Sequence, residues 1–132
     1  MAMRLNHITL VVTDLVRSKE FYRKLGLIQI VDTPPRYARF RMPDGDATLS
    51  VEVIEGSPPN SASAHFFFEC EDVDATVSAL KAQGIEFYQE PTDMFYAWRE
   101  ARLRDPDGHD IRLYTENAKD VRLNPPWKIP GT

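Results

Sequence analysis

The stretch NHITLVVTDLVRSKEFYRKLGL, residues 6–27, decides the fold, because its pattern returns in HFFFECEDVDATVSALKAQGI, residues 65–85. Each copy opens a strand with His, places Asp where a helix begins, and follows that helix with Gly. The matched pairs are each 58 positions apart (65 − 7, 72 − 14 and 84 − 26): His7 and His65, Asp14 and Asp72, Gly26 and Gly84. The repeat indicates one small module used twice, with the two His near a pseudo-twofold axis.

The remaining elements repeat in the same order after each helix. In the first copy we predict strands over 5–13, 27–32, 37–42 and 49–55, with a Pro43-Asp44-Gly45 turn before the last. In the second copy we predict strands over 64–71, 85–89, 96–104 and 110–116, with the matching Pro106-Asp107-Gly108 turn. The expected fold class is α+β: two βαβββ modules with pseudo-twofold symmetry that form a cupped mixed sheet.

These elements fit a single domain of 132 residues. Module one covers 4–55, a polar, Pro-containing linker covers 56–63, module two covers 64–116, and a tail covers 117–132. The tail is expected to be irregular, wrapping the domain or a partner subunit, or else disordered. We expect a homodimer, with Trp127 of the tail reaching the partner.

Composition narrows the class of protein. The chain has 16 Lys and Arg against 20 Asp and Glu, a mildly acidic balance that argues against a nucleic-acid partner. Cys70 is the single cysteine, which is typical of a reducing compartment. Neither a signal peptide nor a membrane span is apparent in the sequence. We therefore expect a cytoplasmic protein with a small-molecule partner.

Strand alternation predicts which side chains face the cavity. On the last strand of module one, the apolar residues Leu49, Val51 and Val53 pack under the helices. Seven residues are then expected to gather on one concave surface: His7, Ser50, Glu52, His65, Phe67, Arg112 and Tyr114. Their mixture of polar, charged and aromatic side chains suits a ligand site. His109, directly after the second turn, is expected to be exposed.

The two copies, together with RDPDGHDIRLY at residues 104–114, resemble the vicinal oxygen chelate superfamily over residues 5–116. That superfamily includes glyoxalase I, methylmalonyl-CoA epimerase, extradiol dioxygenases and bleomycin- or fosfomycin-resistance proteins. The resemblance implies metal ligands on the first and last strands of each module. His7 and His65 match the first-strand ligands, and Glu52 matches one last-strand ligand, with Ser50 as the alternative. The other last-strand ligand, a Glu in the family, falls on Arg112.

A guanidinium does not bind a metal, so this departure argues against ring-cleaving oxygenation. His7, Glu52 and His65 still suit Zn, Ni, Co or Fe. One expected function is a metal-assisted lyase or isomerase of the glyoxalase type, with enediolate chemistry on a small oxygenated, possibly anionic substrate and Glu52 as ligand and base. The alternative is a metal-free binding protein of the bleomycin-resistance type. Arg112, Phe67 and Tyr114 are the candidate substrate-binding residues. Arg112 either anchors an anion or pairs with Glu52 or Glu69.

Overall fold

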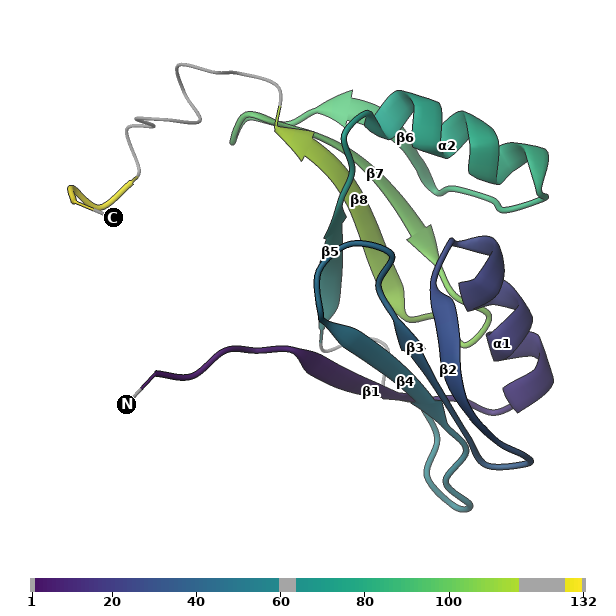
Figure 1. The fold of residues 1–132 in the computed structure, drawn as a ribbon. Helices are drawn as coiled ribbons and strands as arrows, with labels where there is room; N and C mark the ends of the chain where they lie inside the picture. The colour runs from purple at the N-terminus through teal and green to yellow at the C-terminus, as the bar shows by residue number, and fades with distance from the viewer. Residues whose placement is uncertain (1, 60–63, 117–127, 132) are drawn as a thin grey trace. The chain divides into compact units, whose positions relative to one another are not determined.

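The computed structural model describes residues 2–59, 64–116 and 128–131 and divides the chain into two compact units (Figure 1). The first unit comprises Met1–Ala64 and Asp105–His109, and the second comprises His65–Arg104 and Asp110–Thr132. Unit 1 contains β1 (His7–Val11), α1 (Leu15–Lys24), β2 (Ile28–Thr33), β3 (Tyr37–Arg41) and β4 (Thr48–Glu52). Unit 2 contains β5 (His65–Glu69), α2 (Val73–Ala82), β6 (Gln89–Asp93), β7 (Trp98–Arg104) and β8 (Asp110–Glu116).

Both units have the same βαβββ order and the same sheet topology. Sheet A is ordered β1-β4-β3-β2 and sheet B is ordered β5-β8-β7-β6. In each sheet the first strand runs parallel to the last, and the other pairs are antiparallel. The prediction of an α+β fold built from two similar modules is confirmed.

The helix boundaries follow the capping residues that the repeat contains. Asp14 accepts a hydrogen bond from Arg17 N at 3.1 Å, and Asp72 accepts one from Ala75 N at 3.2 Å. Each carboxylate thus satisfies an amide that the first helical turn leaves unpaired. Gly26, with a φ of 107°, lets the chain leave α1 in a conformation that a side chain would strain.

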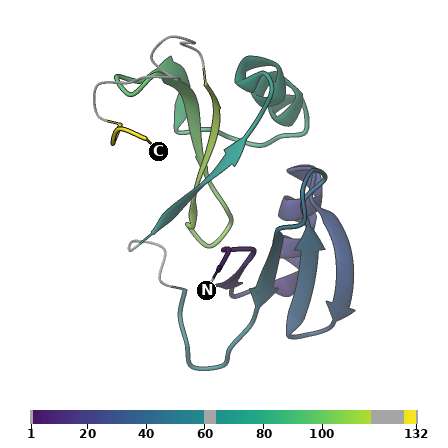
Figure 2. The same cartoon turned by 60° about the vertical axis from the view of Figure 1, so that its left-hand side comes forward.

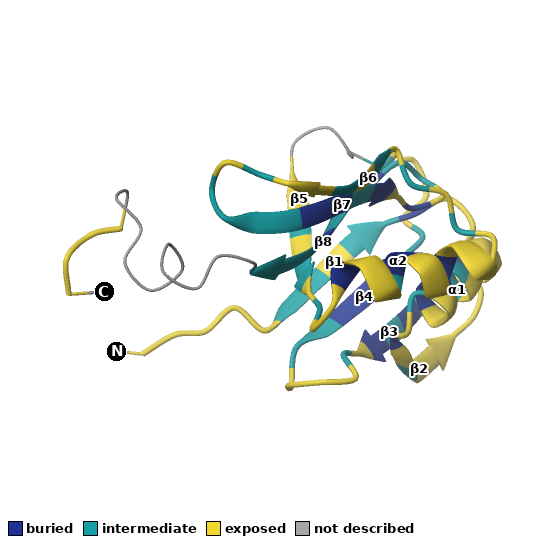
Figure 3. Cartoon of the chain, turned by 90° about the horizontal axis from the view of Figure 1, so that it is seen from above, coloured by how far each residue is buried: buried dark blue, intermediate teal, exposed yellow. Residues whose placement is uncertain are grey.

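Each helix covers one face of its own sheet, as the two views in Figures 1 and 2 show. In unit 1, Leu15 and Tyr22 of α1 are buried with Phe40, Leu49 and Val51 of the sheet. In unit 2, the buried set is Val73, Val77 and Leu80 of α2 with Ala101, Leu103, Ile111 and Leu113. Figure 3 shows this burial on the central strands and on the inner sides of the helices. The other face of each sheet, called here its open face, carries the polar and aromatic side chains.

Two strands in unit 2 differ from the prediction. The strand predicted over 85–89 lies at Gln89–Asp93 and shares only Gln89 with the prediction, and the one predicted from residue 96 begins at Trp98. Residues 86–88 form a connection in which Tyr88 N donates to Arg102 O at 2.9 Å and the Tyr88 hydroxyl donates to Asp110 at 2.7 Å. Residues 94–97 form the hairpin tip between β6 and β7. The periodicity of the sequence alone did not distinguish these polar and aromatic connecting segments from β-strands.

The second Pro-Asp-Gly turn packs within unit 1. Asp105 accepts a hydrogen bond from the buried Tyr22 hydroxyl at 2.7 Å, and Asp107 accepts one from Thr13 Oγ1 at 2.6 Å. The expectation that His109 is exposed was wrong: its side chain is buried, and its Nε2 donates to Val11 O at 2.7 Å. Turn composition predicts exposure only when nothing packs against the turn.

Candidate functional site

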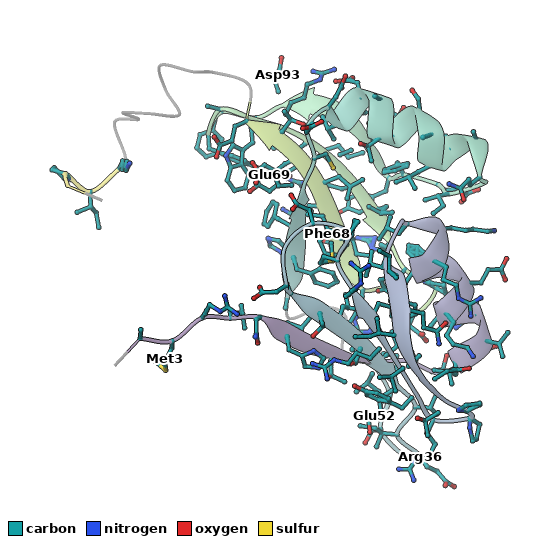
Figure 4. The ribbon with its side chains drawn as sticks, in the orientation of Figure 1. Met3, Arg36, Glu52, Phe68, Glu69 and Asp93 are labelled. Carbon is teal, nitrogen blue, oxygen red and sulfur yellow. The ribbon has the colours of Figure 1, made fainter. Side chains whose placement is uncertain are left out.

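The open face of sheet A carries three of the predicted site residues: His7, Ser50 and Glu52. The β1–β4 register pairs His7 with Thr48, Thr9 with Ser50, and Val11 with Glu52. Glu52 ends β4 opposite Tyr37, and Figure 4 labels it close to Arg36 at that end of the sheet. His7 and Glu52 therefore lie on different strands and at opposite ends of the paired segment.

Hydroxyl groups surround the His7 imidazole. Its Nδ1 shares a hydrogen bond with Thr48 Oγ1 at 2.6 Å, and its Nε2 lies 3.1 Å from Thr9 Oγ1 and 3.3 Å from Ser50 Oγ. The Tyr37 hydroxyl is bonded to Ser50 Oγ at 2.6 Å, and Arg39 donates to Thr48 Oγ1 at 3.1 Å. This set of five residues around His7 is the hydroxyl network. Both ring nitrogens of His7 thus have protein partners.

The open face of sheet B is aromatic at its centre. Trp98 and Tyr114 stack with ring centroids 3.9 Å apart and planes 18° apart. Phe67 meets both rings edge-on, with centroids 5.4 Å from Trp98 and 5.9 Å from Tyr114. Burial and the nearby Glu69 raise the pKa of Tyr114 above its ordinary value. Phe67, Trp98 and Tyr114 form the aromatic cluster, and Phe67 remains 36% exposed.

A buried carboxylate lies beside this cluster. Glu100 is 0% exposed; it accepts hydrogen bonds from Tyr96 Oη at 2.5 Å and Arg102 Nε at 2.7 Å. Arg112 approaches Glu100 only to 3.9 Å and donates to Asp110 at 3.3 Å. The hypothesis that Arg112 forms an ion pair predicted Glu52 or Glu69 as its partner. In the structure Arg112 approaches Glu100 and Asp110 instead. Alternation along β7 could have placed Glu100 on this face, because Glu100 and Arg102 are two residues apart.

One atom of Arg112 is left without a partner. Its Nε is buried and has no hydrogen-bond acceptor among the described residues. The guanidinium lies 5.8 Å from the centroid of the Phe67 ring, within range of a cation–π contact. Leaving a buried donor unpaired is costly, so this position suits an acceptor supplied by a ligand or by water.

The strand registers also show which positions of the two modules are equivalent. Thr9 pairs with Ser50 two residues after His7, and Phe67 pairs with Arg112 two residues after His65. Ser50 is therefore the counterpart of Arg112, and Glu52 is the counterpart of Tyr114. Internal symmetry therefore favours Ser50, the alternative to Glu52, as the position that corresponds to Arg112.

This equivalence bears on how well the residues suit a metal. His7 and His65 occupy matched positions, and imidazole is a suitable donor for a divalent cation. The two last-strand positions do not suit one. Within either unit, the described residues contain no group of three His, Cys, Asp or Glu side chains placed to hold an ion. A site made of His7, Glu52 and His65 would draw on both units, and it stays a prediction.

Comparison with known proteins adds the family. The sequence matches the Glyoxalase/Bleomycin resistance protein/Dioxygenase superfamily over residues 4–113. The chain belongs to this superfamily. It is 32% identical over 127 residues to the uncharacterized protein YraH of Bacillus subtilis, covering 85% of this chain and 98% of YraH.

Solved structures of other proteins share the fold. TnmS3, an antibiotic binding protein from Streptomyces sp. CB03234, is 25% identical with a TM-score of 0.74, over 89% of this chain and 99% of TnmS3. A lactoylglutathione lyase from Agrobacterium tumefaciens is 20% identical with a TM-score of 0.69, over 86% of this chain and 94% of the lyase. The same architecture thus occurs in a binding protein and in an enzyme, and side chains rather than the fold must distinguish them.

Proposed function

We propose that this superfamily member is a small-molecule binding protein that holds an aromatic anion on the open face of sheet B, without needing a metal. The observation that carries the proposal is the buried Arg112 Nε beside the aromatic cluster, which has no acceptor in the part of the chain that the structure describes. An oxyanion on Arg112 would supply that acceptor through a bidentate pair, while a ring packs on the exposed Phe67.

The neighbouring charges explain why Arg112 remains available. A fully buried carboxylate such as Glu100 needs strong partners, and Tyr96 with Arg102 supplies them at 2.5 and 2.7 Å. Arg112 is held in place by Asp110 at 3.3 Å and by the longer approach to Glu100. A guanidinium has five N–H donors, so one hydrogen bond to Asp110 leaves most of them for a ligand. The similarity to TnmS3, an antibiotic binding protein, supports the same class of function.

The test is a calorimetric titration of benzoate and of benzylamine, its cationic counterpart in shape, with and without chelator. We expect benzoate to bind in preference to benzylamine, and Arg112→Gln to weaken benzoate by about tenfold or more, the value of one charge-assisted hydrogen bond. Arg39→Gln, on the other sheet, is the matched control and should change the affinity less than about twofold. Equal losses in both variants, or no preference for the anion, would refute the proposal.

A metal-assisted lyase or isomerase is the second candidate, favoured by the matched positions of His7 and His65. Elemental analysis of protein purified without chelator tests it, because His65→Ala should then remove the bound metal. Arg112→Glu would supply the missing carboxylate and should tighten Zn or Co affinity by about tenfold or more, since it reverses the local charge. Unchanged metal content in His65→Ala would eliminate this candidate.

Two further features belong to the proposal. We infer a homodimer in the cytoplasm; Trp127, the residue expected to reach the partner, lies outside the described residues. No helix in the described part of the chain is long and apolar enough to cross a membrane. Sedimentation at high micromolar concentration tests the dimer, and a monomer there would contradict it.

A further inference from the structure

The hairpin tip between β6 and β7, residues 94–97, has an unusual backbone. Met94 N donates to Trp98 O at 2.8 Å and Ala97 N donates to Met94 O at 3.1 Å, which closes the turn. Ala97 has a φ of 70°, a left-handed conformation that costs a residue with a side chain about 1–2 kcal/mol. Such strain persists where the surroundings enforce it, and it is concentrated at functional sites.

Tyr96 anchors this tip to the open face of sheet B. Its hydroxyl donates to the buried Glu100 at 2.5 Å, and its ring meets Trp98 edge-on with centroids 5.7 Å apart. Burial and the bond to Glu100 raise the pKa of Tyr96 above its ordinary value. The tip is therefore fixed by one hydrogen bond and one ring contact to the binding face.

Phe95 is held next to this anchor and yet is almost fully exposed. Its ring lies edge-on to Tyr96 with centroids 5.0 Å apart, while 88% of the residue is accessible to solvent. Single exposed apolar residues are common and need no explanation by themselves. Phe95 differs because ring contacts continue from it through Tyr96 and Trp98 to the aromatic cluster.

We propose that Phe95, Tyr96 and Trp98 form an outer aromatic subsite, which takes a second ring of a ligand whose anionic group lies at Arg112. The inference rests on the proposed function and narrows its ligand to an elongated anion with at least two aromatic rings. Arg112 is four residues along β8 from Glu116, which pairs with Trp98. The Phe67 ring lies between the two subsites, 5.8 Å from the Arg112 guanidinium and 5.4 Å from the Trp98 ring. The first ring of an acid bound at Arg112 therefore packs on Phe67, and a second ring extends toward Trp98.

Charge on this face sets the direction of the ligand. Arg102 and Arg112 pair with each other across β7 and β8, whereas Glu69 pairs with Tyr114 nearer the outer subsite. Figure 4 labels Glu69 on β5. Glu100 offsets the charge of Arg102, so an anion is attracted to the Arg112 guanidinium and repelled from the Glu69 end. The ring at the outer subsite should therefore be the uncharged end of the ligand.

The experiment compares biphenyl-4-carboxylate with benzoate. Trp98 and Trp127 are the two tryptophans of the sequence, so a Trp127→Phe background leaves Trp98 as the single fluorescent reporter. In that background, Phe95→Ala should weaken biphenyl-4-carboxylate by about three- to tenfold, the value of one aromatic contact, and leave benzoate unchanged. Ile30→Ala, which truncates a 48% exposed side chain on β2, is the matched control and should change neither affinity.

The outcomes separate the two proposals. Equal loss of both probes in Phe95→Ala, or loss of neither, overturns the outer subsite even when Arg112→Gln still weakens benzoate. Failure of the parent protein to bind either acid overturns the proposed function and the subsite together. A selective loss of biphenyl-4-carboxylate supports both.

Discussion

The open faces of sheets A and B have the same strand register but carry different side chains. In the row that follows each His, sheet A carries Thr9, Ser50 and Arg39, whereas sheet B carries Phe67, Arg112 and Arg102. In the next row, Glu52 and Tyr37 of sheet A occupy the positions that Tyr114 and Glu100 occupy in sheet B. The same backbone arrangement thus carries mostly small polar side chains in module one and large aromatic and charged side chains in module two.

The difference indicates which sheet has hydrogen-bonding groups that a ligand would satisfy. In the hydroxyl network of sheet A, hydrogen bonds of 2.6–3.3 Å between protein groups connect His7, Ser50 and Tyr37. On sheet B, the Arg112 Nε finds no acceptor among residues 2–59, 64–116 and 128–131, and Phe67 remains exposed. A network whose donors and acceptors are all satisfied within the protein stabilises the fold. A network with an unsatisfied donor is completed by a ligand.

The two Pro-Asp-Gly turns give the largest predicted difference. Asp105, at 4% exposure, accepts hydrogen bonds from Tyr22 Oη at 2.7 Å and from the Asp107 and His109 amides at 2.9 Å. Asp105→Ala would leave these donors unpaired, two of them buried, and should lower the free energy of unfolding by about 2–4 kcal/mol. Urea denaturation followed by circular dichroism measures it.

Asp44, in the first turn, supplies the control. It is exposed, so Asp44→Ala should change the free energy of unfolding by less than about 0.5 kcal/mol. Equal effects of the two substitutions would show that the turn of residues 105–109 is not a structural part of unit 1.

The two matched His are expected to contribute differently to stability. His7 is bonded through both ring nitrogens to hydroxyl groups, whereas His65 is exposed and meets Phe67 edge-on at 5.5 Å. His7→Ala should therefore cost about 1–2 kcal/mol, and His65→Ala less than about 0.5 kcal/mol. Thermal unfolding of the two variants measures this, and a greater loss in His65→Ala would reverse the assignment of roles.

The repeat predicted the fold because it depends on local rules. Asp14 and Asp72 cap helices, Gly26 and Gly84 adopt positive φ, and strand alternation placed Ser50 and Arg112 on the open faces. Partners from distant strands escaped the sequence, because nothing local to Arg112 names Glu100 as its neighbour. The burial of His109 escaped for the same reason, since its acceptor, Val11 O, is 98 residues away.

Alkaline pH should weaken the packing of α1 and leave the packing of α2 unaffected. Tyr22 and Leu80 are matched, buried residues, but only Tyr22 has a group that ionises. Burial, and then the carboxylate of Asp105, raise the pKa of Tyr22 well above its ordinary value. The folded state then keeps a proton that the unfolded state releases, so the contribution of Tyr22 to stability is constant below pH 10 and falls above it.

The fall due to Tyr22 should be about 1 kcal/mol between pH 10 and pH 11. Urea denaturation of wild type and Tyr22→Phe at pH 8, 10 and 11 measures it. Tyr22→Phe should lose this part of the alkaline slope, although Tyr88, Tyr96 and Tyr114, whose pKa values burial also raises, keep a smaller part. Parallel slopes in the two proteins would show that the Tyr22 hydroxyl does not stabilise the fold.

The smallest predicted effect concerns the hairpin that joins the second and third strands of each module. Module one closes it with Pro34 and Pro35, whereas module two uses residues 94–97 with Ala97 at a φ of 70°. Ala97→Gly removes about 1–2 kcal/mol of left-handed strain and adds about 0.5–1 kcal/mol of unfolded-chain entropy. The net gain in stability should be about 0.5 kcal/mol, whereas Ala79→Gly, on the exposed side of α2, should cost about 1 kcal/mol. If the strain holds Phe95 and Tyr96 for a ligand, Ala97→Gly should also weaken biphenyl-4-carboxylate while it raises the melting temperature. A stabilised variant with undiminished affinity would mean that the strained turn closes the hairpin and contributes nothing to recognition.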